Sequence, residues 1–200
     1  MLHWLFPEMS GSLMALCGIL TAFTMTVIAT AKLAPYLPKD GGRAFAHDGK
    51  LSAGKPRGAG IIFVLAFVVA TLFFLPLQAE LIIYLILIVI SMLTGYLDDA
   101  SSTPWGEYKK GFLDLCVAVM VAFNYIKHNG CDVDLAILGV SFTMPAWIFA
   151  ILTVILVWTS VNVTNCADGV DGLSGTLAII SILSIYALDL LRECDEHLRT

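Results

Sequence analysis

Six apolar stretches, separated by short polar segments, constrain this sequence more than any other feature. Each stretch has 16 to 22 residues, and a helix of about 20 apolar residues crosses a hydrocarbon core about 30 Å thick. The stretches run near residues 12–33, 58–77, 81–97, 111–126, 144–163 and 173–191. The pattern predicts an all-α, polytopic transmembrane helical bundle with six spans, forming a single transmembrane domain over residues 1–200.

The composition agrees with a membrane protein and excludes other classes. Hydrophobic residues make up 58% of the 200 residues and charged residues 14%, whereas a soluble domain has about 45–50% apolar and about 25% charged residues. The net charge of −5 argues against a nucleic-acid partner, which would require a basic surface. The five cysteines are widely spaced without a CxxC pair, so neither a disulfide framework nor a zinc site is indicated.

The basic residues predict the orientation of the bundle. Eight of the eleven lysines and arginines fall on one side of the predicted membrane: Lys32, Lys39, Arg43, Lys50, Lys55, Arg57, Lys109 and Lys110. Because basic loops stay in the cytoplasm, segments 38–57, 98–110 and 164–172 are expected to be cytoplasmic. The N-terminus and segment 127–143 are then external. The external segment contains Asn129-Gly130, a pair typical of tight turns, and is expected to form a short hairpin.

Two adjacent carboxylates, Asp98 and Asp99, close the third stretch. Like charges so close together repel each other, and acidic side chains at membrane depth are candidates for a functional site that binds a cation. The alternative is that the two residues only mark the place where a span ends.

A second polar cluster lies between the fifth and sixth stretches, over residues 165–172. Asn165, Asp168 and Asp171 follow one another at intervals of three residues, so one face of a helical turn could carry all of them. Carboxylates, an amide and glycines before a helix suit Mg²⁺ and phosphate oxygens together. The alternative is a capping loop in which Asp171 caps the sixth span and the glycines only turn the chain.

Basic residues stand at the start of the second and fourth stretches. Lys55 and Arg57 belong to the segment Gly54-Lys55-Pro56-Arg57-Gly58-Ala59-Gly60, and Lys110 precedes the fourth stretch. Glycines and cations at the start of a helix can receive a diphosphate, although basic residues also simply retain a loop in the cytoplasm. Asp114, four residues after Lys110, is a candidate ion-pair partner on the same helix.

The predicted topology brings all of these clusters to the cytoplasmic face of the membrane. Acids for a divalent cation and cations for phosphates indicate phosphoryl-group chemistry. A cation-coupled transporter subunit is the alternative from another class, but the predicted spans have almost no charge at their centres, where transporters place ionisable residues. An inactive remnant that inserts without performing chemistry is a third alternative.

Three motifs occur here in an order and topology that one family shares. They are a Pro-x-x-x-Gly opening of the second span, the Asp-Asp pair closing the third, and Asn-x-x-Asp-Gly-x-Asp-Gly-Leu from Asn165 to Leu173. The chain thus resembles the polyprenyl-phosphate N-acetylhexosamine-1-phosphate transferases of glycosyltransferase family 4. It looks most like the branch that transfers phospho-N-acetylmuramoyl-pentapeptide, and the resemblance covers nearly the whole chain.

The resemblance implies a Mg²⁺-dependent, multi-pass enzyme of the bacterial plasma membrane. Such an enzyme transfers phospho-N-acetylmuramoyl-pentapeptide from its UDP donor to undecaprenyl phosphate, giving lipid I and UMP in peptidoglycan synthesis. Another UDP-N-acetylhexosamine, such as UDP-N-acetylglucosamine, is the alternative donor, for cell-wall or surface polymers. The partners it implies are UDP-N-acetylmuramoyl-pentapeptide, undecaprenyl phosphate, the lipid bilayer, and either a second copy of the chain or a partner chain.

The resemblance also implies roles for individual residues. Asp98 and Asp99 match the family's catalytic pair beside the lipid phosphate. Asp98 would deprotonate or orient that nucleophile, and a covalent aspartyl intermediate is the rival proposal. The implied substrate-binding residues are Asn165, Asp168, Asp171, Lys55 and Lys110. The implied metal ligands in this sequence are Asp171 and Asp99.

The sequence departs from the family pattern at several places. Ser102 stands where the family has a lysine three residues after the acidic pair. The family's Thr-Pro-Thr-Met-Gly-Gly is replaced by residues 55–60, so the basic residue that approaches the nucleotide is expected to be Lys55. The family also has later spans, with a further aspartate as principal Mg²⁺ ligand and a histidine-rich loop. We therefore expect the chain to correspond to the N-terminal six-span part and to be inactive as an isolated polypeptide.

Overall fold

The computed structural model describes residues 8–41, 53–101, 103, 105–135, 139–167 and 172–199, with side chains as far as residue 190. Residues up to Val154 form one compact unit, and residues from Ile155 form a second. The elements of the first unit are α2 (Gly11–Leu33), the 3-10 helix η1 (Ala34–Tyr36), α3 (Gly60–Phe74), α4 (Ala79–Ala100), α5 (Glu107–Asn129), β1 (Asp132–Leu135) and β2 (Val140–Thr143). Helix α6 (Ala146–Ala167) runs from the first unit into the second, and α7 (Leu173–Arg199) follows it.

Five helices among the described residues are long and apolar enough to cross a membrane. They are Gly11–Tyr36, Ala79–Ala100, Glu107–Asn129, Ala146–Cys166 and Leu173–Leu190. Their surfaces carry large apolar side chains, such as Phe23, Trp147 and Ile185, which are 67%, 67% and 68% exposed. Helices that are apolar on all sides are typical of membrane spans. The prediction of a polytopic, all-α membrane bundle is confirmed.

The second predicted span, residues 58–77, forms a shorter helix than expected. Helix α3 has 15 residues, a length of about 22 Å at 1.5 Å per residue. It ends at Phe74 because Pro76 disfavours helical backbone at the residue before it, and Leu75 is extended, with φ −98° and ψ 151°. The fourth predicted span, residues 111–126, is instead longer, because α5 extends it at both ends to 23 residues.

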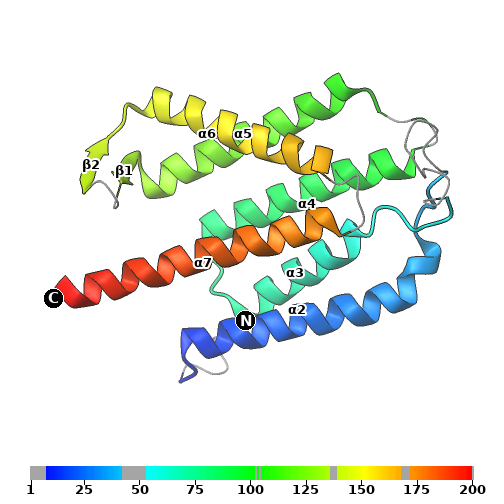
Figure 1. Ribbon diagram of the computed structural model, residues 1–200, viewed down its shortest axis with the longest axis horizontal. Helices are drawn as coiled ribbons and strands as arrows, with labels where there is room; N and C mark the ends of the chain where they lie inside the picture. Colours follow the sequence, from blue (N-terminus) through cyan, green and yellow to red (C-terminus); the bar gives the residue numbers. More distant parts are fainter. Residues whose placement is uncertain are drawn as a thin grey trace. The chain divides into compact units, whose positions relative to one another are not determined.

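Helices α2 to α5 pack against one another in chain order, α2 on α3, α3 on α4 and α4 on α5. Figure 1 shows that successive helices of this series run in opposite directions. Small buried residues at the contacts, among them Ala66, Ala70, Ala118 and Ala122, let neighbouring helices approach closely. The alternation places the start of α3, the end of α4 and the start of α5 together at one end of the first unit (Figure 1).

The segment predicted to be external contains a hairpin, but Asn129-Gly130 is not its turn. Strands β1 and β2 pair antiparallel, with Asp132 opposite Thr143, and Thr143 Oγ1 donates a hydrogen bond of 2.5 Å to Asp132 Oδ1. Gly130 has φ 79° and ψ −157° and ends α5, because this backbone conformation is essentially restricted to glycine and does not continue a helix. The Asn-Gly pair is therefore a helix terminus.

Candidate active site

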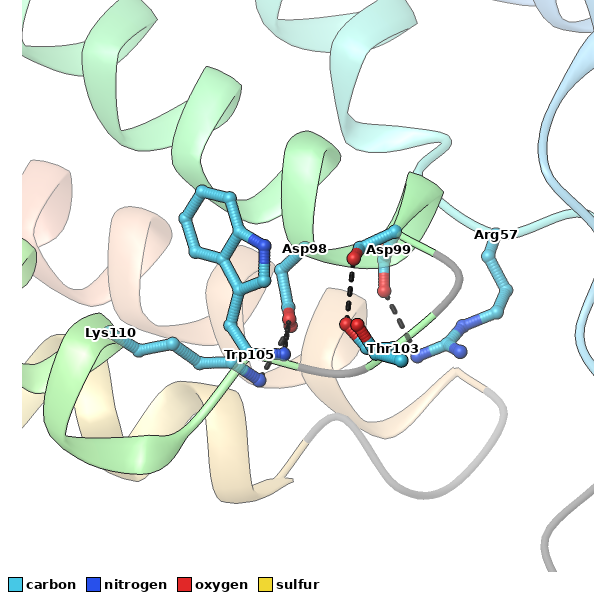
Figure 2. Close-up of polar contacts among 7 residues, drawn as sticks. Arg57, Asp98, Asp99, Thr103, Trp105 and Lys110 are labelled. Carbon is cyan, nitrogen blue, oxygen red and sulfur yellow. Dashed lines mark hydrogen bonds and ion pairs between the residues drawn. The ribbon is translucent and has the colours of Figure 1, made fainter.

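The two predicted catalytic acids lie in the last turn of α4. Successive side chains on a helix point about 100° apart, so Asp98 and Asp99 face different neighbours. Figure 2 shows Asp98 directed toward Trp105 and Lys110, and Asp99 directed toward Arg57. The acid pair therefore connects the end of α4 to two other segments of the chain.

Asp98 binds the turn after α4 and the first turn of α5. Lys110 Nζ lies 2.5 Å from Asp98 Oδ2, and the backbone N–H of Trp105 donates a hydrogen bond of 2.8 Å to Asp98 Oδ1. The spacing in the sequence pointed to Asp114 as the partner of Lys110, but the ion pair in the structure is with Asp98. Both carboxylate oxygens of Asp98 thus contact a donor.

Asp99 forms a second ion pair, with a residue of the loop before α3. Arg57 Nη2 lies 2.9 Å from Asp99 Oδ1. The Arg57 and Asp99 side chains are 42% and 29% exposed, compared with 30% and 16% for Lys110 and Asp98. Each acid is therefore paired with a cation from a different segment, and the Arg57–Asp99 pair is the more accessible of the two.

Backbone hydrogen bonds hold the loop that carries Arg57. The N–H of Arg57 donates to Pro38 O at 2.7 Å, and the N–H of Asp40 donates to Lys55 O at 2.8 Å. These bonds join the two described stretches of the loop as a short antiparallel pair. The backbone at Arg57 is therefore fixed by the fold.

Gly58 sets how closely this loop approaches α4. Its φ is 69°, in the left-handed region that residues with a side chain disfavour. A Cβ at this position would lie 2.9 Å from Cδ2 of Tyr96 and 3.8 Å from Cβ of Asp99. The absence of a side chain at Gly58 thus permits the contact that brings Arg57 within reach of Asp99.

The turn between α4 and α5 adds an indole and a further lysine beside the acids. Ser101 Oγ donates a hydrogen bond of 2.6 Å to Thr103 O. Lys109 Nζ lies 3.3 Å from the centroid of the Trp105 ring, a cation–π contact. Lys109 therefore covers the Trp105 ring, while the backbone N–H of Trp105 donates to Asp98.

Three of the four polar clusters found in the sequence meet at this site. The loop before α3, the acid pair and the start of α5 are joined by the two ion pairs. Lys55, the predicted substrate-binding residue of the loop, is exposed, and its role stays a prediction. The sequence did not predict the contact between Arg57 and Asp99. The positive charge of Arg57 was the only feature of the sequence that indicated it.

The fourth cluster, residues 165–172, is only partly covered by the described residues. Asn165 is exposed near the end of α6 and belongs to the second unit. Asp168 and Asp171 lie outside the described residues. Their assignment to substrate and metal binding therefore stays a prediction.

The described residues do not by themselves form a binding site for the implied Mg²⁺. Across the part of the chain that the structure describes, no group of three or more His, Cys, Asp or Glu side chains is placed to hold a metal ion. Asp98 and Asp99 are each paired with a cation. Mg²⁺ requires an octahedral set of oxygen ligands, which these two acids alone do not supply.

Comparison with known proteins identifies related membrane enzymes. The chain is 40% identical over 153 residues to the phospho-N-acetylmuramoyl-pentapeptide-transferase of Treponema pallidum (strain Nichols), a match that covers 74% of this chain and 41% of the relative. Proteins of the same name from Symbiobacterium thermophilum and Fervidobacterium nodosum are each 28% identical, over 62% and 76% of this chain and 40% and 50% of their own lengths. The chain thus spans half or less of these curated relatives. No solved structure matches it.

A family model covers the part of the chain that carries most of the site. The model for glycosyl transferase family 4 matches residues 81–198, which include Asp98, Asp99 and Lys110. The match extends over more than half of the chain and agrees with the resemblance deduced from the motifs. The chain belongs to glycosyl transferase family 4.

Proposed function

We propose that the protein carrying this sequence transfers phospho-N-acetylmuramoyl-pentapeptide from its UDP donor to undecaprenyl phosphate, giving lipid I and UMP. Relatives in three genera bear the name of that transferase. The observation that carries the proposal is the pair of adjacent carboxylates, each held by a cation, where apolar helices end. Joining a lipid phosphate to a nucleotide sugar needs acids and phosphate-binding cations at the membrane boundary.

In this reaction an oxygen of the lipid phosphate attacks the phosphorus atom that is bonded to the sugar. A new P–O bond joins the two phosphates, and the bond from that phosphorus to the oxygen bridging to UMP breaks. UMP leaves with the bridging oxygen and with the negative charge that develops there. Cations that hold phosphate oxygens stabilise this transition state.

Lys110 and Asp98 suit the lipid phosphate side of the reaction. Lys110 stands in the first turn of α5, and Asp98 is held in place by the Trp105 N–H. A phosphate that binds Lys110 would displace the Asp98 carboxylate from it. Asp98 could then orient the lipid phosphate or accept its proton.

Mg²⁺ is part of the proposal through the family resemblance. When bound, the ion would neutralise charge on the diphosphate. Asp99 is the one described residue assigned to it, so its remaining ligands would come from elsewhere, such as Asp171. Residues beyond this chain, in the same protein or in a partner chain, would complete the site, because the chain covers 41% of the T. pallidum relative.

We also propose that the site faces the cytoplasm of a bacterial plasma membrane. Eight of the eleven basic residues lie on the predicted cytoplasmic side, the distribution expected from the positive-inside rule. The starts of α3 and α5 and the end of α4 lie at the same end of the first unit. A site at this end would meet the nucleotide sugar from the cytoplasm and the lipid phosphate from the inner leaflet.

A comparison of two donors tests the proposal. It uses the native-length protein, meaning the whole protein that contains this sequence, in detergent. UDP-N-acetylmuramoyl-pentapeptide and UDP-N-acetylglucosamine are each incubated with undecaprenyl phosphate, and UMP release and the mass of the lipid product are measured. We expect product from the first donor, its loss in Asp98→Asn, and its retention in Asp134→Asn, a matched acid-to-amide change on the exposed hairpin. If only UDP-N-acetylglucosamine gives product, that nucleotide sugar is the donor. If neither donor releases UMP, the proposal that the protein is a transferase is refuted.

A further inference from the structure

The ion pair between Arg57 and Asp99 has the features of a contact that a phosphate can replace. We propose that Arg57 binds phosphate oxygens of a substrate and that its guanidinium leaves Asp99 to do so, which releases the Asp99 carboxylate into the site. The identity of that substrate rests on the proposed function. The binding itself rests on the geometry, exposure and anchoring of Arg57.

The guanidinium has capacity beyond its contact with Asp99. The ion pair joins one nitrogen, Nη2, to one oxygen, Oδ1, at 2.9 Å, whereas a guanidinium offers five N–H donors in a planar fork. That fork matches phosphate oxygens in a bidentate manner, which an ammonium group does not. With 42% of the side chain exposed, an incoming phosphate can reach it.

The exposure of the pair also makes the exchange easy. Ion pairs that are open to solvent are weakly held, because water and salt screen the two charges. The Lys110–Asp98 pair is less exposed, with side chains 30% and 16% exposed against 42% and 29% for Arg57 and Asp99. Of the two ion pairs, the one at Arg57 is therefore expected to open first when an anion arrives.

The backbone under Arg57 is already in position. The Arg57 N–H is bound to Pro38 O, and Gly58 lies against Tyr96 on α4. The side chain can therefore move from carboxylate to phosphate without rearrangement of the loop. Preorganisation of this kind reduces the entropy lost on binding.

The two cations lie on opposite sides of the acid pair, Arg57 from the loop before α3 and Lys110 from α5 (Figure 2). Two anion positions are therefore available, one for each cation. Lys110 belongs to an apolar helix and Arg57 to a polar loop. We accordingly assign Arg57 to the diphosphate of the soluble donor rather than to the lipid phosphate.

Binding measurements on the 200-residue chain in detergent test this inference without requiring turnover. The dissociation constants of UDP and of undecaprenyl phosphate are measured for the unsubstituted chain, Arg57→Gln, Arg57→Lys and Lys39→Gln. Lys39 belongs to the same loop and is exposed, so its substitution removes the same charge while keeping the Arg57–Asp99 ion pair. Arg57→Gln should weaken UDP binding about ten- to a hundredfold, Arg57→Lys should weaken it less, and Lys39→Gln should leave it unchanged.

A second variant tests the exchange itself. If Asp99 competes with the ligand for Arg57, Asp99→Asn should tighten UDP binding by about two- to fivefold in the absence of Mg²⁺, where Asp99 has no metal ion to hold. The gain should disappear in Asp99→Asn/Arg57→Gln, because no guanidinium is left to be released. A general loss of structure would not strengthen binding, so this result separates the exchange from misfolding.

The binding measurements and the transfer assay of the proposed function can fail separately. A loss of UDP affinity confined to Arg57 supports the donor assignment, and a loss confined to undecaprenyl phosphate keeps the phosphate site but moves it to the acceptor. Equal losses in Arg57→Gln and Lys39→Gln, or no binding of either ligand by the unsubstituted chain, overturn the inference. If Arg57→Gln weakens UDP binding while the native-length protein transfers no sugar phosphate, the inference stands and the proposed function fails.

Discussion

Replacement of Gly58 by alanine should destabilise the protein through two separate effects. The φ of 69° places an alanine in the left-handed region, at a cost of about 1–2 kcal/mol. The new Cβ would also lie 2.9 Å from Cδ2 of Tyr96, and overpacking of this kind costs about 1–3 kcal/mol. The free energy of unfolding should therefore fall by about 2–5 kcal/mol in total.

Two other glycines provide matched controls that separate these effects. Gly54 has φ 84°, and a Cβ there would meet nothing within 4 Å, so Gly54→Ala should show the backbone cost alone. Gly106 has φ −63°, open space around a Cβ and the N-cap position of α5, so Gly106→Ala should show only the cost of an alanine N-cap, below about 1 kcal/mol. The difference between Gly58→Ala and Gly54→Ala then measures the contact with Tyr96.

The assay unfolds the chain in mixed micelles by increasing the share of a denaturing detergent. The loss of helix is followed by circular dichroism. Tyr96→Ala should reduce the effect of Gly58→Ala to about that of Gly54→Ala, because the ring that obstructs the Cβ is gone. If Gly58→Ala and Gly54→Ala destabilise equally, within about 0.5 kcal/mol, the close approach of the loop to α4 is absent and the reasoning about Arg57 loses its support.

Other predictions concern the polar contacts of the first unit. Asp98→Asn should lower kcat for UMP release in the native-length protein by about 10²–10⁴, and unchanged turnover would remove Asp98 from the mechanism. Trp105→Ala removes the ring that Lys109 covers and should cost about 0.5–1 kcal/mol in unfolding experiments. Trp105→Pro also removes the N–H that holds Asp98, so this variant should lose more turnover than Trp105→Ala, and equal losses would argue against that role. Asn124 is 4% exposed and donates a hydrogen bond of 3.1 Å to Glu80 O, so Asn124→Ala should destabilise the bundle by about 0.6–1.7 kcal/mol; an increase in stability would contradict this estimate.

Features that depend on composition over many residues could be predicted from the sequence. Runs of apolar residues indicated the positions of α2 to α7, because burial in a membrane requires nothing more specific than length and apolarity. The meeting of the loop before α3, the acid pair and the start of α5 could also be predicted. It follows from the alternating direction of successive helices, and the two ion pairs bear it out.

Features that depend on tertiary contacts could not be predicted in the same way. The helical spacing made Asp114 a candidate partner of Lys110, whereas the ion pair of the folded chain joins Lys110 to Asp98. Arg57 and Lys55 carry the same charge two residues apart, and the pairing of the loop with Pro38 determines that Arg57 reaches the acids. Asn129-Gly130 has the sequence of a tight turn, yet Gly130 terminates α5. In each case a local pattern fits two structures, and for Lys110 and Arg57 a contact with a distant residue decides between them.

The short helix α3 has a consequence for the bilayer around the site. Its 15 residues span about 22 Å against a hydrocarbon core of about 30 Å, while its neighbours α2 and α4 have 23 and 22 residues. A membrane meets such hydrophobic mismatch by thinning locally or by drawing flanking polar groups inward, at a small cost per ångström. We expect lipid headgroups to dip beside α3, which would bring phosphate groups of the bilayer nearer to the level of Arg57 and Lys110.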